Sequence, residues 1–191
     1  MVSFSHELRR KSIHLAALLI PLGLYLVPES AALLVLGFLA GACLTADLLR
    51  MRIPALTRLF FKIFGPLLKE HEKRKHLTGS TYLLIAAFLC VWGFGSKIAT
   101  VALLYLILGD TTAALVGRRW GRIRLGRKTL EGSASCLIIC VAVALLFPSV
   151  PTYAALAGAV AATFVEWLPW PIDDNLAIPL TAGLTIKLLT F

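Results

Sequence analysis

Charged residues are scarce in this chain of 191 residues, and acidic residues are the scarcest. It holds 10 Asp and Glu against 19 Lys and Arg, and only 15% of its residues are charged. Its hydrophobic fraction of 59% exceeds the share that is usual in a soluble domain. The shortage of charge therefore argues against a soluble domain and favours a protein embedded in a lipid bilayer.

Other features that would define a protein class are missing too. No stretch rich in Pro, Gly or Ser separates two parts, and no internal repeat is visible, so we expect one domain over 1-191. The four cysteines lie in apolar runs, and their spacing fits neither a zinc site nor a redox pair. No basic patch with interleaved aromatic residues stands outside the apolar runs, so nucleic acid is not an expected partner.

Long apolar runs are what the chain has in abundance. Several are about 17–20 residues long, enough to cross a hydrocarbon core of about 30 Å. We therefore predict an all-α, polytopic membrane bundle of about seven transmembrane helices. The runs are 12–28, 31–49, 79–96, 98–117, 132–148, 152–168 and 175–190. The segment 53–68 has amphipathic helical periodicity and predicts an additional helix lying along the membrane interface.

The basic residues cluster in three segments between these runs. Seventeen of the 19 Lys and Arg residues lie in the N-terminal tail, in 50–75 and in 118–128. By the positive-inside rule, these segments and the N-terminus face the cytoplasm, and an odd number of spans places the C-terminus outside. We expect a multi-pass protein of the cell (inner) membrane, with its basic face attracted to anionic lipid headgroups.

Acidic residues at membrane depth are the strongest functional signal. On the predicted cytoplasmic side they are Asp47, Asp110, Glu131, Glu166, Asp173 and Asp174. Asp110 lies about seven residues inside its span, roughly 10 Å deep. A charge at mid-helix costs at least about 2.5–3.5 kcal/mol on insertion, so such residues face the protein interior. Asp110 could pair with a base such as Lys128 or Lys11, or it could hold Mg²⁺ beside substrate phosphates.

Two further motifs stand at the starts of predicted spans, and each allows two interpretations. Lys128, Thr129, Glu131, Gly132 and Ser133 could form a helix cap with an acid in its first turn, or a pocket for phosphate and metal. The motif Asp173, Asp174 and Asn175 has the same two interpretations. The residue types alone do not choose between them.

The first span opens with Arg10, Lys11 and His14. The two bases could simply anchor the helix, whereas an imidazole with an ordinary pKa near 6.5 suits general acid or base chemistry. Gly117 and Gly121 have a spacing that is typical of closely packed membrane helices, but it would also let a phosphate approach the backbone. Both alternatives remain open here.

Taken together, these segments resemble a known family. They are RRKSIHL (9–15), HLTGSTYLL (76–84), GDTTAALVGRRWGR (109–122), GRKTLEGS (126–133) and DDNLAIPLTAG (173–183). They resemble the CTP-dependent polyprenol, phytol and diacylglycerol kinases, a family that includes dolichol kinases and is related to the membrane cytidylyltransferases. The chain is shorter than the larger dolichol kinases, so the resemblance does not imply dolichol itself as the substrate.

The resemblance implies transfer of the γ-phosphoryl group from CTP to a lipid alcohol, with Mg²⁺ or a similar ion. The catalytic residues that we expect are Asp110, Glu131, Asp174 and His14, with either Asp174 or His14 as the base for the lipid hydroxyl. The implied nucleotide-binding residues are Arg10, Lys11, Gly117, Lys128, Thr129, Gly132, Ser133 and Asn175. The implied metal ligands are Asp110, Glu131 and Asp173.

Two rival functions differ in what they require. A CTP:phosphatidate-type cytidylyltransferase shares the acidic and basic elements but releases pyrophosphate and forms a CDP-lipid. A small transporter would carry acids at several depths through the bilayer. Here the acids within the runs gather on one side, which favours chemistry at a membrane surface.

Overall fold

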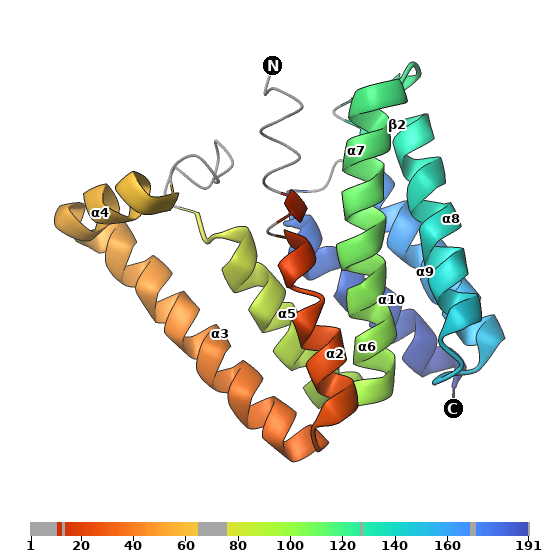
Figure 1. Ribbon diagram of the computed structural model, residues 1–191, viewed down its shortest axis with the longest axis horizontal. Helices are drawn as coiled ribbons and strands as arrows, with labels where there is room; N and C mark the ends of the chain where they lie inside the picture. Colours follow the sequence, from red (N-terminus) through yellow and green to blue (C-terminus); the bar gives the residue numbers. More distant parts are fainter. Residues whose placement is uncertain (1–10, 13, 65–75, 127, 169–170, 191) are drawn as a thin grey trace.

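The computed structural model describes residues 11–12, 14–64, 76–126, 128–168 and 171–190 of the chain (Figure 1). Arg10, and the last four residues of the predicted amphipathic segment, lie outside this described part. The helices are α2 (Leu19–Leu26), α3 (Glu29–Arg52), α4 (Pro54–Phe64), α5 (Gly79–Phe94), α6 (Ser96–Leu104), the π-helical η2 (Tyr105–Asp110), α7 (Thr111–Trp120), α8 (Leu130–Leu146), α9 (Thr152–Trp167) and α10 (Asp174–Leu189). The predicted all-α class is confirmed.

Each of the seven predicted apolar runs falls on a helix, and helical turns before α2 extend the first one back toward residue 11. Among the described helices, two are long and apolar enough to cross a bilayer: α3, with 24 residues, and the continuous helix Ser96–Trp120, with 25. Three shorter apolar helices are His14–Leu26, Gly79–Phe94 and Leu130–Leu146. The number of seven transmembrane spans stays a prediction.

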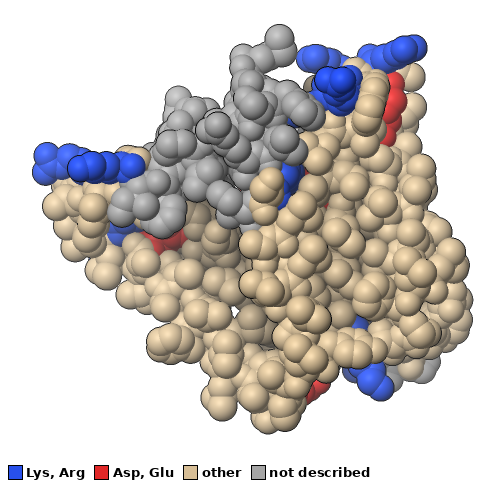
Figure 2. All heavy atoms as spheres, in the orientation of Figure 1, with Lys and Arg blue, Asp and Glu red and all other residues tan. Residues whose placement is uncertain are grey.

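Every second connection between the helices lies at the same end of the bundle, and these connections carry the polar segments. The start of the described chain, α4, the end of α7 and the short strand β2 (Lys128–Thr129) all lie toward the top in Figure 1, whereas the C-terminus lies at the bottom. Lys and Arg side chains gather over α4 and around the tip of α7 (Figure 2). We call this the basic end. It is the end where α3 and α7 finish and where α5, α8 and α10 begin.

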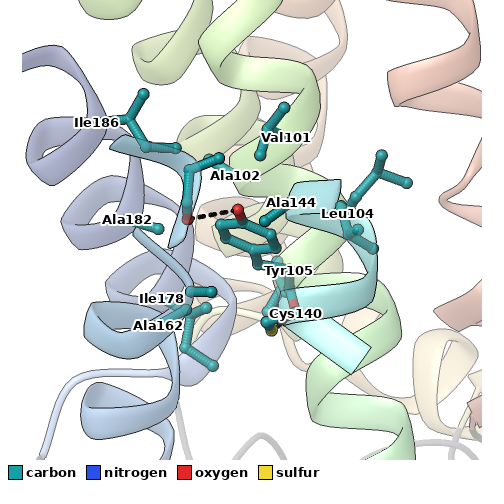
Figure 3. Packing of buried hydrophobic residues seen from close by; sticks show 14 of the residues in the cluster. Val101, Ala102, Leu104, Tyr105, Cys140, Ala144, Ala162, Ile178, Ala182 and Ile186 are labelled. Atoms are coloured by element: carbon teal, nitrogen blue, oxygen red, sulfur yellow. Dashed lines mark hydrogen bonds between the residues drawn. The ribbon is translucent and has the colours of Figure 1, made fainter. Parts of the chain in front are cut away.

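The core beneath the basic end is built mainly from small side chains. Ala155, Ala159 and Ala162 of α9 and Ala182 of α10 are buried, which lets these helices approach closely. Tyr105, a large residue in this core, is fully buried and donates its hydroxyl to the Ala155 carbonyl at 2.7 Å (Figure 3). That bond fixes the start of η2 against α9.

The π-helical segment η2 is a departure from the regular helix that the apolar run predicted. It begins at Tyr105 and ends at Asp110, and such wide turns are frequent at functional sites. Next to Asp110, a Cβ at Gly109 would lie 2.9 Å from the sulfur atoms of both Cys136 and Cys140. Only glycine fits there without displacement, so close packing against α8 sets the position from which Asp110 emerges.

A small β-hairpin joins α7 to α8, where the sequence predicted no strand. Its strands β1 (Arg124–Leu125) and β2 (Lys128–Thr129) are antiparallel. Gly126 in the turn has φ of 64°, which glycine adopts at little cost. The hairpin matters for the site because β2 delivers Lys128 and the cap of α8.

Candidate active site

Asp110 lies in an ion pair with Lys11 at the basic end. The Lys11 ammonium contacts the Asp110 carboxylate and also donates to the Asp110 carbonyl at 3.2 Å. Lys11 is only 4% exposed. His14 Nε2 lies 4.0 Å from the same carboxylate oxygen. These three residues, from the helical turns before α2 and from η2, form what we call the Lys11 group.

A second group surrounds Lys128. Its ammonium lies 3.1 Å from Asp174 Oδ2 and 3.3 Å from Glu166 Oε1, and it also donates to the Glu166 carbonyl. The Ser133 hydroxyl donates to Glu166 Oε2 at 2.9 Å. Strand β2 and helices α8, α9 and α10 thus each contribute one member, and we call this the Lys128 group.

The two groups interact electrostatically. Burial alone would lower the pKa of the Lys128 ammonium, but the carboxylates of Asp174 and Glu166 outweigh it and raise the pKa above its ordinary value. Asp110 is among the charges that contribute to this increase. Lys128 is therefore positively charged at neutral pH, and we treat both groups as one charged cluster.

Glu166 is a member of this cluster to which the sequence analysis gave no role. Its side chain is buried, and both carboxylate oxygens are engaged, one by Lys128 and one by Ser133. The only sequence signal was an acid inside an apolar run, the same signal that singled out Asp110. Its partners lie more than thirty residues away along the chain, so the pairing needed the fold.

Glu131, in contrast, lies in the first turn of α8, where its carboxylate contacts the segment between α7 and the hairpin. Its Oε1 accepts from the backbone amides of Arg122 at 2.9 Å and Ile123 at 3.2 Å. Hydrogen bonds from its own amide and from the Arg122 amide hold the pKa of its carboxyl below the usual value. The structure therefore places this acid at the tip of α7, and its role as a metal ligand stays a prediction.

At the start of α10, each of the two interpretations that the sequence allowed applies to a different residue. Asp173 is the N-cap: its Oδ1 accepts from the Asn175 amide at 3.0 Å and from the Asn175 side chain at 2.7 Å. Asp174 points to Lys128 instead. The motif thus combines a helix cap with a member of the charged cluster.

Gly117 and Gly132 lie against each other at the crossing of α7 and α8. A Cβ at Gly117 would lie 2.6 Å from Thr129 Oγ1, and one at Gly132 would lie 2.7 Å from the Ala113 carbonyl oxygen. Thr129 caps α8 by accepting from the Gly132 amide at 3.1 Å. Close helix packing and capping thus account for these three residues structurally, and their contact with a phosphate stays a prediction.

Another buried polar group joins α3 to α5. Asp47 Oδ1 accepts from Arg50 Nε at 2.6 Å, while Oδ2 accepts from the Thr78 amide at 2.8 Å and the Thr81 hydroxyl at 2.7 Å. Arg50 also donates to the His76 carbonyl at 2.7 Å. Since both carboxylate oxygens are bound, we interpret this group as a structural contact that holds α3 against α5. It gives the segment 76–84 a structural role through Thr78 and Thr81.

Comparison with known proteins gives the family. No protein-family model matches the chain. No solved structure matches it either. The chain is 30% identical to the CTP-dependent diacylglycerol kinase 1 of Schizosaccharomyces pombe, over 98% of this chain and 95% of that protein. It is 34% identical to a phytol kinase of Synechocystis over 58% of this chain and 54% of that protein. With a dolichol kinase of Arabidopsis thaliana it shares 30% identity over 78% of this chain and 27% of that protein.

The relative from Schizosaccharomyces pombe is matched over nearly its whole length, so the similarity extends over nearly all of both sequences and not over a shared segment alone. The protein therefore belongs to the family of CTP-dependent lipid kinases, as the sequence motifs predicted.

Proposed function

We propose that this protein transfers the γ-phosphoryl group of CTP to a membrane lipid alcohol at the charged cluster. The products are the lipid monophosphate and CDP. The observation that carries the proposal is the position of Lys128 between Glu166 and Asp174, within the electrostatic reach of Asp110. Members of this cluster come from the helical turns before α2 and from η2, β2, α8, α9 and α10, and they meet at the basic end.

The cluster supplies what phosphoryl transfer requires, which is mainly positioning and neutralisation of charge. Lys11 and Lys128 are positive, and carboxylates hold them in place. A triphosphate can replace those carboxylates as the partner of the two ammonium groups. The fixed lysines then orient the phosphate chain for attack on the γ-phosphorus.

In the transfer step, the lipid oxygen forms a bond to the γ-phosphorus while the bond from that phosphorus to the β,γ-bridging oxygen breaks. CDP leaves with the bonding electron pair, and the proton of the lipid hydroxyl passes to a base. Asp174 and His14 are the two candidate bases in the cluster. His14 lies beside Asp110, whereas Asp174 lies beside Lys128.

The donor set also fits Mg²⁺. Among the described residues, no group of three or more His, Cys, Asp or Glu side chains could hold a metal ion alone. Mg²⁺, however, is usually held by one or two carboxylates together with substrate phosphates, and Asp110 and Asp174 can supply these. When bound, such an ion would neutralise charge on the phosphates. The predicted contribution of Asp173 remains part of the proposal. Glu131, whose carboxylate accepts from the amides of Arg122 and Ile123, is assigned a different role below.

We further propose that the protein spans the membrane several times with its basic end in the cytoplasm. The outer face of α3 supports this, because Leu34 and Phe38 are 77% and 75% exposed on a helix of 24 residues. Helix α4 begins where α3 ends, at the basic end, where an interfacial helix is expected. A lipid chain lying beside these helices would present its hydroxyl at the level of the cluster.

Identification of the nucleotide product tests the proposed function. Purified protein in detergent with CTP, Mg²⁺ and a panel of lipid alcohols, including diacylglycerol and phytol, is expected to release CDP and form a lipid monophosphate. A reaction without lipid alcohol is the control for CTP hydrolysis. Release of pyrophosphate with formation of a CDP-lipid would contradict the proposal and identify a cytidylyltransferase instead.

A further inference from the structure

The tip of α7 carries a surface hollow to which the transfer step gives no use. It has a volume of about 490 Å³ and is lined by Arg119, Trp120, Gly121, Arg122 and Glu131. The Trp120 side chain is 65% exposed. Figure 2 shows acidic and basic side chains together at this tip. We call this site the hairpin hollow.

Asp110 of the charged cluster and the hollow lie at opposite ends of α7. Helix α7 runs from Thr111, next to Asp110, to Trp120. Trp120 follows Asp110 by ten positions, which corresponds to about 15 Å along the helix axis. In CTP, a ribose and two further phosphates separate the base from the γ-phosphorus. A nucleotide whose γ-phosphate lies in the cluster can therefore extend along α7 toward the tip.

The groups around the hollow are suited to a flat heterocycle. The exposed indole of Trp120 offers a stacking face, and base–aromatic stacking is the usual way in which proteins hold an unpaired base. Glu131 is held by its bonds to the amides of Arg122 and Ile123, which engage mainly Oε1. Its Oε2 lies 3.4 Å from the Ile123 amide, and as a carboxylate oxygen with two lone pairs it can accept a further hydrogen bond.

We propose that the hairpin hollow binds the cytosine base of CTP, and that Glu131 and Trp120 determine nucleotide specificity. This inference rests on the proposed function. The exocyclic amino group of cytosine donates a hydrogen bond, and a carboxylate is its natural acceptor. The guanidinium groups of Arg119 and Arg122 can donate to the cytosine O2 and N3 acceptors.

The same chemistry excludes uracil. Uracil carries a carbonyl where cytosine carries the amino group, so its oxygen would face the Glu131 carboxylate. Sites that hydrogen-bond one substrate group reject an analogue that lacks it, because their polar groups are then left unpaired. CTP and UTP should therefore differ strongly as donors.

The substitution Glu131→Gln tests this assignment. Glutamine keeps an oxygen for the Arg122 amide, so the hairpin is expected to fold, but its amide can also donate to the uracil carbonyl. We expect the ratio of kcat/KM for CTP over UTP to fall at least about tenfold. The matched control is Glu29→Gln at the opposite end of the bundle, where Glu29 accepts from the Ser96 amide. It should leave the ratio unchanged.

Substitutions of Trp120 separate base binding from anchoring at the membrane, the other use of an exposed indole. Trp120→Ala should raise KM for CTP about tenfold, and Trp120→Phe, which keeps an aromatic face, should restore most of the affinity. A change in KM for the lipid alone would overturn the inference and make Trp120 a membrane anchor. An unchanged CTP/UTP ratio in Glu131→Gln would overturn it too. Failure of the unaltered protein to use CTP would refute the proposed function as well.

Discussion

Replacing Asp110 by Asn is expected to reduce phosphoryl transfer by at least about 10²–10³-fold, the loss that follows when one preorganised electrostatic contact to a transition state is removed. Asparagine has nearly the same shape as aspartate, but it carries no charge. Its amide oxygen binds a divalent cation and the Lys11 ammonium much more weakly than a carboxylate does. Initial rates of lipid phosphorylation with saturating CTP measure the effect.

The same substitution also affects folding, so a second variant is needed. Lys11 is 4% exposed, and loss of Asp110 would leave its charge buried without this carboxylate. Removing one partner of a buried ion pair costs about 3–5 kcal/mol. The double variant Lys11→Met with Asp110→Asn removes both charges, and it should regain most of that unfolding free energy in a denaturant titration in detergent.

Turnover of the single and double variants distinguishes a catalytic role of Asp110 from a purely structural ion pair. If Asp110 and Lys11 act on the nucleotide, the double variant regains stability but stays as inactive as the single variants. If the pair is only structural, turnover returns together with stability. Recovery of about a tenth of the original rate or more in the double variant would remove Asp110 from the catalytic residues.

Substitution of Lys128 by Met should have an effect of similar size. It removes the charge that we assign to phosphate binding, and we expect a loss of about 10²–10³-fold in kcat/KM for CTP. It also leaves the buried Glu166 carboxylate with Ser133 but without its lysine. Lys128→Arg keeps a positive charge and should retain measurably more activity than Lys128→Met.

A matched control is provided by Lys97→Met. Lys97 is exposed near the start of α6, at the end of the bundle opposite to the charged cluster. Its substitution should leave kcat/KM for CTP within about twofold of the original value, since exposed charges contribute little. Equal activities of Lys128→Met and Lys97→Met would contradict the role assigned to Lys128.

The sequence allowed a good prediction of the helices and of the most important acid. The apolar runs located the helices because a lipid-facing or buried helix needs continuous apolar residues. Asp110 stood out because a charge within such a run is costly. Its partner Lys11 was one of two candidates, since both lie at the same predicted membrane surface.

The pairings between distant elements could not be predicted. Glu166 joins Lys128 and Ser133 only because α9 packs beside α8, and one sequence carries no direct sign of that neighbour. The hairpin depends on two residues per strand, too few to leave a periodic pattern. The sequence therefore showed no sign that Glu131 would accept from the amides of Arg122 and Ile123. The π-helical turn at Asp110 depends on the space that Gly109 leaves for two cysteines of α8.

Glycine spacing was ambiguous for a related reason. A glycine lets any group approach its backbone, whether a phosphate or another helix. At Gly117 the group that approaches is Thr129 with the start of α8. Sequence spacing describes the opening on one helix, and only the packed structure shows what fills it.

A structure with a CTP analogue that has a methylene group in place of the β,γ-bridging oxygen, determined in the presence of Mg²⁺, tests the central claim most directly. The account predicts the γ-phosphate between Asp110 and Lys128, with Asp174 in contact or bridged through the ion. The triphosphate bound away from both residues, for example at the opposite end of the bundle, would contradict it.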